Sequence, residues 1–288
     1  MSMPFDSDHV SDDPAIFRDI ISKTTLAAGW RRVRRNGGGP GGDGQTAAQF
    51  ARRLSANIAA LAADLGRGRY QPGPLRISRI PKANGSMRTL AVPPIRDRVV
   101  QSAAAMVLAP RLDAGMSPAS FAYRAGLSVE QAAALVTVYR LRGYCWVVDG
   151  DIADFFPSIL HAPLMALLSG TIRCQRSCAL IARWLDAFSR DGRGLAQGSP
   201  LSPLLSNLAL SPVDRAIDGK NTRLVRYADD FLLMTKSRAD AEAAAERMAA
   251  LIRPMGLALN ASKTRIAHLD EGIRFLGYRF ERDRLGRG

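Results

Sequence analysis

The sequence predicts an α+β fold in which an antiparallel sheet is backed by helices. Two apolar runs, 224–225 and 231–234, flank the polar centre Ala-Asp-Asp at 228–230, which is the pattern of a β-hairpin with two carboxylates at or beside its tip. A separate apolar run, 146–152, also carries acidic residues at its end. Stretches with helical periodicity lie on both sides of these predicted strands.

Length and charge narrow the class of protein. The 288 residues allow one large domain or two small ones, and 47% apolar residues suffice for a sizeable core. The net charge of +14 favours a polyanionic partner whose binding weakens as salt rises. There is no uncharged run long enough to span a membrane and no secretory signal. Three cysteines fit a reducing cytoplasm, and Cys174 and Cys178 lack the two further ligands that a zinc site needs.

The other predicted elements follow from periodicity. Residues 1–14 are acidic and aperiodic, so we expect a loose tail. Helices are predicted at 15–30, 46–65, 95–112, 128–140, 162–168, 174–188, 201–210 and 239–252. Strands at 75–80 and 87–92 are predicted to form a hairpin, and 256–264 and 273–280 to supply two or three short strands.

A basic run, 31–35, precedes the glycine-rich stretch 36–44. The simple interpretation of the glycines is a flexible linker. The alternative is a backbone that approaches phosphates closely, beside the four arginines. The stretch is not a P-loop, because no Gly-Lys-Ser/Thr follows it.

The two acidic strand ends suggest a metal site. Aspartate is common in turns, so an ordinary turn pair explains Asp229 and Asp230 equally well when they are taken alone. Asp151 changes this balance, because two strand ends that each bring carboxylates can meet in one sheet. Carboxylate oxygens suit Mg²⁺, and two ions about 3.5–4 Å apart can clamp the attacking and leaving oxygens of a nucleotidyl transfer. The pattern therefore suggests the palm of a nucleic-acid polymerase.

Four motifs in a fixed order carry a family resemblance. They are Asp151-Ile-Ala-Asp-Phe-Phe156, Gln197-Gly-Ser-Pro-Leu-Ser-Pro-Leu-Leu-Ser-Asn207, Tyr227-Ala-Asp-Asp230 and Phe275-Leu-Gly-Tyr278. The tetrad alone is short and unspecific, but the ordered set resembles the reverse transcriptases of the bacterial group II intron-like branch. The resemblance runs from about residue 37 to 280, and the stretch 38–44 is similar to the N-terminal extension of that branch.

The resemblance implies which residues carry the chemistry. Asp151 and Asp229 would be the ligands of two Mg²⁺ or Mn²⁺ ions, and the backbone carbonyl of Ile152 would complete the shell of one ion. Asp230 would be the supporting carboxylate, so the implied catalytic set is Asp151, Asp229 and Asp230.

The resemblance also implies a nucleotide site. Phe156 would lie under the sugar and clash with a 2′-hydroxyl, favouring dNTPs, although core packing also explains this ring. Asp154 and the backbone of Phe155 would line the 3′-hydroxyl pocket. Gln197 would contact the nucleotide or template, unless it is only a buried loop residue. Lys263 matches a lysine near the departing pyrophosphate, and a surface lysine is its simple alternative.

Two further features come from the same resemblance. Lys82 and Arg88 match cations that grip the triphosphate, although a solvated charged face explains them as well. The strand Phe275, Leu276, Gly277 and Tyr278 resembles the primer grip. The family commonly has Asp-Ser-Ile where this chain has 157–159, Pro-Ser-Ile, a departure expected to change helix entry and not chemistry.

The resemblance divides the chain into a disordered tail (1–14), mainly fingers with the N-terminal extension (15–145), and mainly palm with the primer-grip strand (146–288), with the thumb absent. The expected function is RNA-directed DNA synthesis in the cytoplasm from an RNA template, a DNA or RNA primer and dNTPs. Thumbless enzymes of this kind resemble CRISPR-associated reverse transcriptases. A thumb-supplying domain or a CRISPR adaptation integrase is therefore an expected partner, in spacer acquisition or phage defence.

Two other functions stay open at this point. An RNA-dependent RNA polymerase would share the carboxylates but would need a polar group where Phe156 stands. A non-catalytic or maturase-like RNA-binding module of a group II intron-type protein would not need its three carboxylates intact, and here all three are present.

Overall fold

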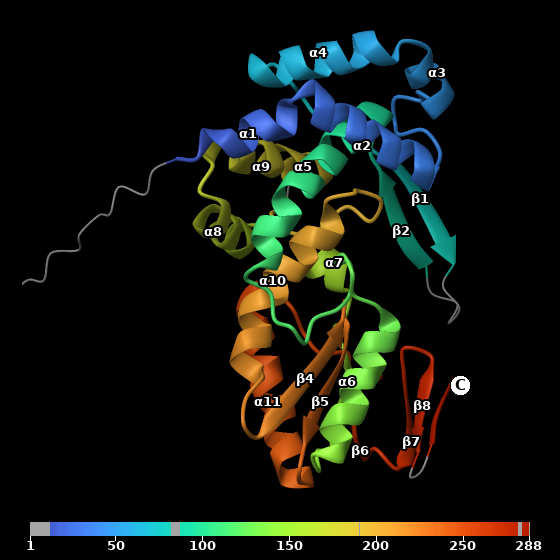
Figure 1. Cartoon of the computed structure of the whole chain (residues 1–288), viewed down its shortest axis with the longest axis vertical. Coiled ribbons are helices and arrows are strands. Elements are labelled where there is room, and N and C mark those ends of the chain that lie inside the picture. Colours follow the sequence, from blue (N-terminus) through green and yellow to red (C-terminus); the bar gives the residue numbers. More distant parts are fainter. Residues whose placement is uncertain (1–11, 82–86, 190, 282–283, 288) are drawn as a thin grey trace, which may run out of the picture. The chain divides into compact units, whose positions relative to one another are not determined.

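The computed structural model describes residues 12–81, 87–189, 191–281 and 284–287 (Figure 1). The chain forms two compact units, one made of 1–111 with 165–187 and the other of 112–164 with 188–288. Most of the predicted tail and the predicted triphosphate contact Lys82 lie outside the described residues. Which parts act as fingers and which as palm stays a prediction.

The first unit is mainly helical. Its elements are α1 (Pro14–Ile21), α2 (Lys23–Asn36), α3 (Ala47–Arg52), α4 (Leu54–Gly66), the strands β1 (Arg76–Pro81) and β2 (Met87–Val92), and most of α5 (Ile95–Asp113) and α9 (Gln175–Phe188). The single helix predicted at 15–30 is two helices, because the Ser22 side chain accepts the Thr25 amide proton and starts a new helix. The helix predicted at 46–65 breaks at Arg53, whose φ of −125° is not helical.

The glycine-rich stretch packs closely on neighbouring backbone. A Cβ atom at Gly42 would lie 2.5 Å from the carbonyl oxygen of Pro74, and one at Gly41 would lie 2.6 Å from the carbonyl carbon of Pro93. The Gly42 amide also donates to the Pro74 carbonyl at 2.9 Å. Close approach of two backbones, which only glycine permits, therefore explains these two residues without a flexible linker.

The second unit contains a four-stranded antiparallel sheet with strand order β4-β5-β3-β6, which confirms the α+β prediction. The strands are β3 (Trp146–Asp151), β4 (Thr222–Tyr227), β5 (Asp230–Thr235) and β6 (Arg265–His268). The strand predicted within 256–264 is wrong: the carbonyl of Asn260 accepts the amide protons of Lys263 and Thr264, which makes a turn there. Strand pairing beyond an isolated bridge at Leu259 resumes at residue 265.

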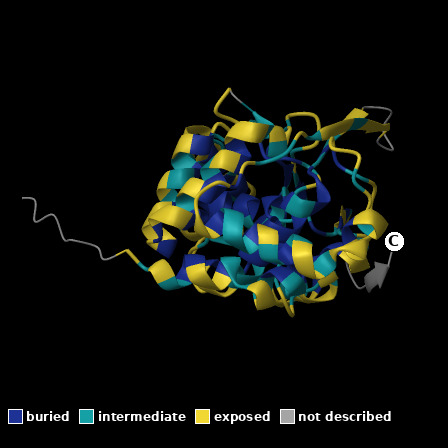
Figure 2. Cartoon of the chain, turned by 90° about the horizontal axis from the view of Figure 1, so that it is seen from above, coloured by how far each residue is buried: buried dark blue, intermediate teal, exposed yellow. Residues whose placement is uncertain are grey.

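Helices and a small sheet cover the four-stranded sheet. Helix α6 (Val129–Leu141) and the strands β7 (Glu271–Phe275) and β8 (Tyr278–Glu281) share one buried apolar cluster with β3, β4, β5 and β6. The helices α10 (Ser202–Ile217) and α11 (Arg238–Ile252) pack on β4, and α11 also contacts β3 and β5. Around the helices, buried positions alternate with exposed ones, as amphipathic sequences require (Figure 2).

The remaining elements are short or cross between the units. They are α7 (Phe155–Ser158), α8 (His161–Ile172), the 3₁₀ turn η1 (Arg253–Met255) and β9 (Arg284–Arg287), which pairs with β8. No helix in the described part of the chain has the length and apolar composition to cross a bilayer.

Short strands are present within 273–280, as predicted, but the Phe275–Tyr278 motif is the turn between two of them and not one continuous strand. Phe275 and Tyr278 are paired across β7 and β8, and the two residues between them form the turn. Leu276 has φ 53° and Gly277 has φ 79°, and positive φ at both central positions is the requirement of a two-residue type I′ turn. Gly277 therefore interrupts the apolar run at 273–280. The primer-grip role of these four residues stays a prediction.

Candidate active site

The carboxylates lie at the end of the sheet where β3 meets the β4–β5 hairpin. Asp151 is the direct cross-strand partner of Asp230, and Tyr227 pairs with Asp230 on the other side. Ala228 and Asp229 form the connecting two-residue turn, in which Ala228 has φ 60°. Directly opposed residues in an antiparallel pair have Cβ atoms about 4.5–5.5 Å apart and point to the same face. The pairing of β3 with β5 therefore brings the two predicted acidic strand ends together.

A glycine between two acids shapes the end of β3. Gly150 is opposed to Phe231 on β5, and the Phe231 ring is completely buried. A Cβ atom at Gly150 would lie 2.6 Å from Cε2 of this ring. The Asp-Gly-Asp sequence thus lets β3 carry Asp149 and Asp151 on one face while an aromatic ring covers the other face.

Two carboxylates at this end of the sheet have raised pKa values. Burial, followed by the negative charges of Asp229 and Asp151, raises the pKa of Asp230 from 3.8 to about 6. The residue as a whole remains exposed, so a cation from solvent can reach it. Burial also raises the pKa of Asp149, and a hydrogen bond from Arg265 opposes that shift. Burial and neighbouring negative charge therefore both disfavour the ionised form of Asp230.

Lys263 and Asn260 hold Asp151. The Lys263 Nζ atom lies 2.9 Å from Asp151 Oδ2, and Asn260 Nδ2 donates to Oδ1 at 3.1 Å. The Asn260 amide also donates to the Asp151 carbonyl at 2.8 Å. Hydrogen bonding to Asp151 raises the pKa of Lys263. Asp151 is only 8% exposed, so these contacts fix its side chain.

The donor set fits a divalent cation, although the side chains are not gathered into a ready site. Among the described residues no group of three His, Cys, Asp or Glu side chains is arranged to hold a metal ion. The carboxylates of Asp151 and Asp229 nevertheless lie close enough to Asp230 to raise its pKa. Carboxylate oxygens are hard ligands, which Mg²⁺ and Mn²⁺ prefer. In this structure the Lys263 ammonium partly balances their charge. Ile152, the predicted backbone ligand, is buried and bridges to Leu259.

The predicted nucleotide residues of the same unit follow directly after β3. Asp154 is exposed and left-handed, with φ 40°, Phe155 is 3% exposed, and Phe156 is half-buried. The Phe155 and Phe156 rings pack edge to face with centroids 5.4 Å apart. The Phe156 carbonyl accepts the Leu195 amide proton at 2.8 Å, which ties this segment to the loop that carries Gln197.

Gln197 carries a signal of its own. Its Oε1 atom is buried and has no hydrogen-bond partner within the part of the chain that the structure describes. Buried acceptors are nearly always satisfied in folded proteins, so an orphaned one at a predicted nucleotide contact fits a missing donor on a ligand. In the other unit, Arg88 is exposed on β2 opposite Ile80.

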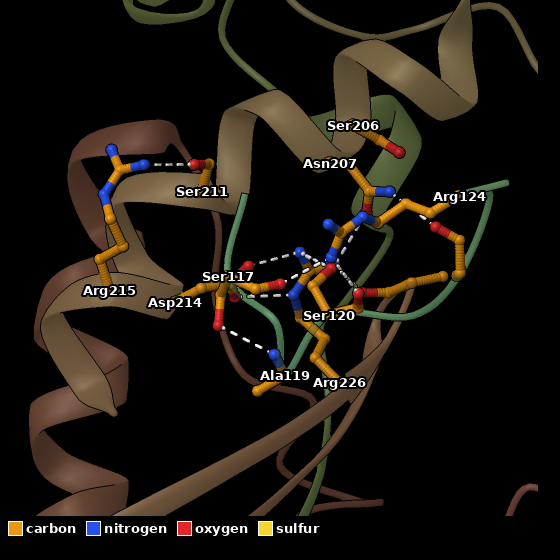
Figure 3. A network of polar contacts seen from close by, with 12 residues as sticks. Ser117, Ala119, Ser120, Arg124, Ser206, Asn207, Ser211, Asp214, Arg215 and Arg226 are labelled. Carbon is orange, nitrogen blue, oxygen red and sulfur yellow. Dashed lines mark hydrogen bonds and ion pairs between the residues drawn. The ribbon is translucent and has the colours of Figure 1, made fainter. Parts of the chain in front are cut away.

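Sequence reasoning missed residues that support the acids. Asn260 is one. Another is a buried polar network on and beside β4, which Figure 3 shows: Ser120, Asn207, Asp214 and Arg226. The signal was present, because Arg226 directly follows the apolar pair Leu224-Val225 in a predicted buried strand, and a charged residue there requires a buried partner.

An antiparallel sheet with paired acids on a hairpin turn and on the adjoining strand end is the arrangement expected of a nucleic-acid polymerase. The family described as reverse transcriptase (RNA-dependent DNA polymerase) matches residues 80–280. The chain belongs to this family. The family implies an RNA template and nucleotides, and its members generally use divalent metal ions.

Two relatives place the chain within the family. Protein YkfC of Escherichia coli K12 is 31% identical, with 85% of this chain and 76% of the relative covered. The group II intron-encoded protein LtrA of Lactococcus lactis subsp. cremoris is 26% identical, with 73% of this chain and 47% of LtrA covered. The resemblance to the group II intron-like branch is confirmed.

Two solved structures are also similar. A chain of a partial Cas6-RT-Cas1–Cas2 complex is 29% identical, with a TM-score of 0.49, covering 83% of this chain and 42% of that one. A telomerase structure from Candida albicans has a TM-score of 0.60 at 13% identity, covering 84% of this chain and 50% of the other, which shows the shared fold alone. The chain thus spans half or less of LtrA and of both structures.

Proposed function

We propose that this chain extends a DNA or RNA primer on an RNA template by two-metal nucleotidyl transfer. The observation that carries the proposal is the cross-strand pairing of Asp151 with Asp230 beside the turn residue Asp229, in a chain of the reverse transcriptase family. The raised pKa of Asp230 supports it, because carboxylates that repel one another are what a divalent cation stabilises.

The proposed chemistry assigns a task to each residue. Asp151, Asp229 and the main chain at Ile152 would hold the ions, which when bound supply a more acidic primer 3′-hydroxyl and charge stabilisation of the pyrophosphate. Asn260 keeps Asp151 in place through its side-chain and main-chain bonds. Lys263, which pairs with Asp151 in this structure, would interact with the negative charge of the leaving pyrophosphate.

The nucleotide would be held by residues around the strand end. Phe156, half-buried on α7, would exclude a 2′-hydroxyl and so select dNTPs. Gln197 would find a partner for its buried Oε1 atom on the nucleotide or the template. By the family resemblance, Arg88 of β2 and Lys82 would grip the triphosphate, Arg88 by a bidentate fork.

Primer extension tests the proposal. A primed RNA template is extended in Mg²⁺ with dNTPs or with rNTPs, using the chain and its Asp229→Asn variant. Glu242→Gln is the matched control, because it makes the same change at an exposed carboxylate of α11. We expect dNTP incorporation that Asp229→Asn abolishes and Glu242→Gln preserves, with hybrid binding kept by both. Synthesis that survives in Asp229→Asn would refute the metal role of the turn.

The same measurements separate the other expected functions. Tight hybrid binding without synthesis by the unmodified chain would favour the maturase-like RNA-binding module. Incorporation of rNTPs in preference to dNTPs would favour an RNA polymerase. The predicted cellular context, with a thumb-supplying domain or a CRISPR adaptation integrase as partner in the cytoplasm, is tested by the neighbouring genes and by recovery of synthesis when the encoded partner is added.

A further inference from the structure

Arg226 is an unusual residue for its place. It lies in β4, one residue before Tyr227, and its side chain is completely buried. A buried guanidinium loses its hydration, so it persists only where acceptors surround it. Apolar residues of similar volume usually serve a core at least as well. Stability of the fold alone therefore does not explain why this position carries a charged side chain.

Most hydrogen bonds of the Arg226 guanidinium go to side chains of one helix, α10. Nε and Nη2 donate to the two carboxylate oxygens of Asp214 at 2.7 and 2.6 Å, which is a bidentate pair. Nη1 donates to Asn207 Oδ1 at 3.1 Å, and both partners belong to α10 (Figure 3). The guanidinium plane is thus fixed from one side by two side chains that are themselves buried.

The remaining bonds reach the catalytic turn and a loop. Nη1 donates to the Ala228 carbonyl at 2.9 Å, and Nη2 donates to Ser120 Oγ at 2.7 Å. The main chain of Arg226 also pairs with the loop, donating to the Ala119 carbonyl and accepting the Phe121 amide proton. One side chain therefore joins α10, the loop beside β4 and the turn between β4 and β5.

The contact with Ala228 acts where the backbone is least favourable. Ala228 has φ 60°, a left-handed conformation that residues with a Cβ atom rarely adopt. Its carbonyl belongs to the peptide group that leads into Asp229. A bond that holds this carbonyl therefore sets the orientation of that peptide plane, and with it the direction in which Asp229 leaves the turn.

We propose that Arg226 is a positioning residue that presents Asp229 and Asp230 to the metal ions. Asp214 and Asn207 orient its guanidinium, and the guanidinium holds the Ala228 carbonyl and the left-handed turn. The inference rests on the proposed function of the carboxylates. It predicts that the turn loses metal affinity when the guanidinium is removed, even where the fold is retained.

The decisive variant removes both charges together. Arg226→Met with Asp214→Leu replaces the buried pair by apolar residues, a change that is often neutral or stabilising for a fold. The matched control, Arg238→Met with Glu242→Leu, makes the same change in an exposed ion pair on α11. Arg226→Lys is the second variant, because an ammonium can pair with Asp214 but lacks the planar fork that reaches Ala228 as well.

Three quantities are measured: the thermal unfolding midpoint without metal, Mn²⁺ affinity by electron paramagnetic resonance on a chain-terminated primer–template, and kcat against KM for dNTP. For Arg226→Met/Asp214→Leu we expect a folded chain with a lower unfolding midpoint, because Asn207, Ser120 and the Ala228 carbonyl each lose a donor. Mn²⁺ affinity and kcat should each fall roughly 10- to 100-fold, the usual effect of losing an outer-shell partner, with KM little changed. The surface control should match the unmodified chain in all three.

The outcomes are distinct. A folded Arg226→Met/Asp214→Leu variant with unchanged Mn²⁺ affinity and kcat would show that Arg226 is only structural. If that variant does not fold, Arg226→Lys decides by the same Mn²⁺ titration. An unmodified chain that binds Mn²⁺ but makes no DNA would remove the synthesis proposal and leave the positioning role testable. An unmodified chain whose Mn²⁺ binding does not depend on Asp229 would overturn both.

Discussion

Replacing Gly150 by alanine should destabilise the sheet through one ring. The added Cβ atom would come closest to Cζ of Phe231, and it would lie 2.6 Å from Cε2 and 3.0 Å from Cε1 of the same ring. Ordinary carbon–carbon contacts are about 3.5–4 Å, so the overlap is about 1 Å. Phe231 is completely buried on the neighbouring strand, directly opposite Gly150, and has little room to turn away.

The size of the effect follows from this overlap. Overpacking a well-filled core typically costs about 1–3 kcal/mol, and the complete burial of the Phe231 ring places Gly150→Ala toward the upper end, at about 2–3 kcal/mol. Shortening the ring by Phe231→Leu removes the clash, so alanine at 150 should then be close to neutral. The coupling free energy between the two positions is expected to be about 2 kcal/mol.

Urea unfolding followed by circular dichroism measures this cycle on the unmodified chain, the two single variants and the double variant. Gly170→Ala is the control, because a Cβ atom at this helical glycine meets nothing within 4 Å. It should be neutral or stabilising by up to about 1 kcal/mol. If Gly150→Ala costs as much in the Phe231→Leu background as in the unmodified chain, the ring is not the cause and the reasoning fails.

Three further predictions concern the acids and the nucleotide. The pKa of Asp230 is raised to about 6, so the folded state holds a proton that the unfolded chain releases near 3.8, and stability is lost as pH rises through this window. Without metal, the advantage of Asp230→Asn in thermal midpoint should therefore grow from pH 4 to 6 and then level off, whereas a constant advantage would contradict the shift. Lys263→Met removes the cation from Asp151, so Mg²⁺ should raise its thermal midpoint more than that of the unmodified chain; an equal rise would show that Lys263 does not balance these carboxylates. Phe156→Ala should improve the use of rNTPs relative to dNTPs roughly tenfold or more in competitive primer extension, and unchanged selectivity would leave Phe156 as a packing residue.

The sequence alone determined the local elements that carry the site. The two apolar runs on either side of Ala228-Asp229-Asp230 predicted the β4–β5 hairpin, and the register confirms it. The order of four short motifs predicted the family, which the match over residues 80–280 confirms. Each apolar run and each motif consists of a few consecutive residues, so these local patterns can be recognised in the sequence directly.

Turns inside predicted strands were harder to predict. The run at 273–280 has the composition of one strand, but Leu276 and Gly277 adopt positive φ and fold it into a hairpin. A strand was also predicted within 256–264, but the main chain turns at Asn260 instead. In both places a turn satisfies backbone groups locally, and its stability depends on what packs against it.

Only the tertiary structure decided which distant residues hold the acids. Lys263 meets Asp151 across 112 positions of the chain, and Ser120 meets Arg226 across 106. Side-chain periodicity carries no information about such pairs. They come together only when the strands pair and the loop that carries Ser120 packs beside β4. Their energetic reason is burial: once Arg226 and Asp151 lose water, each must find partners wherever the fold places them.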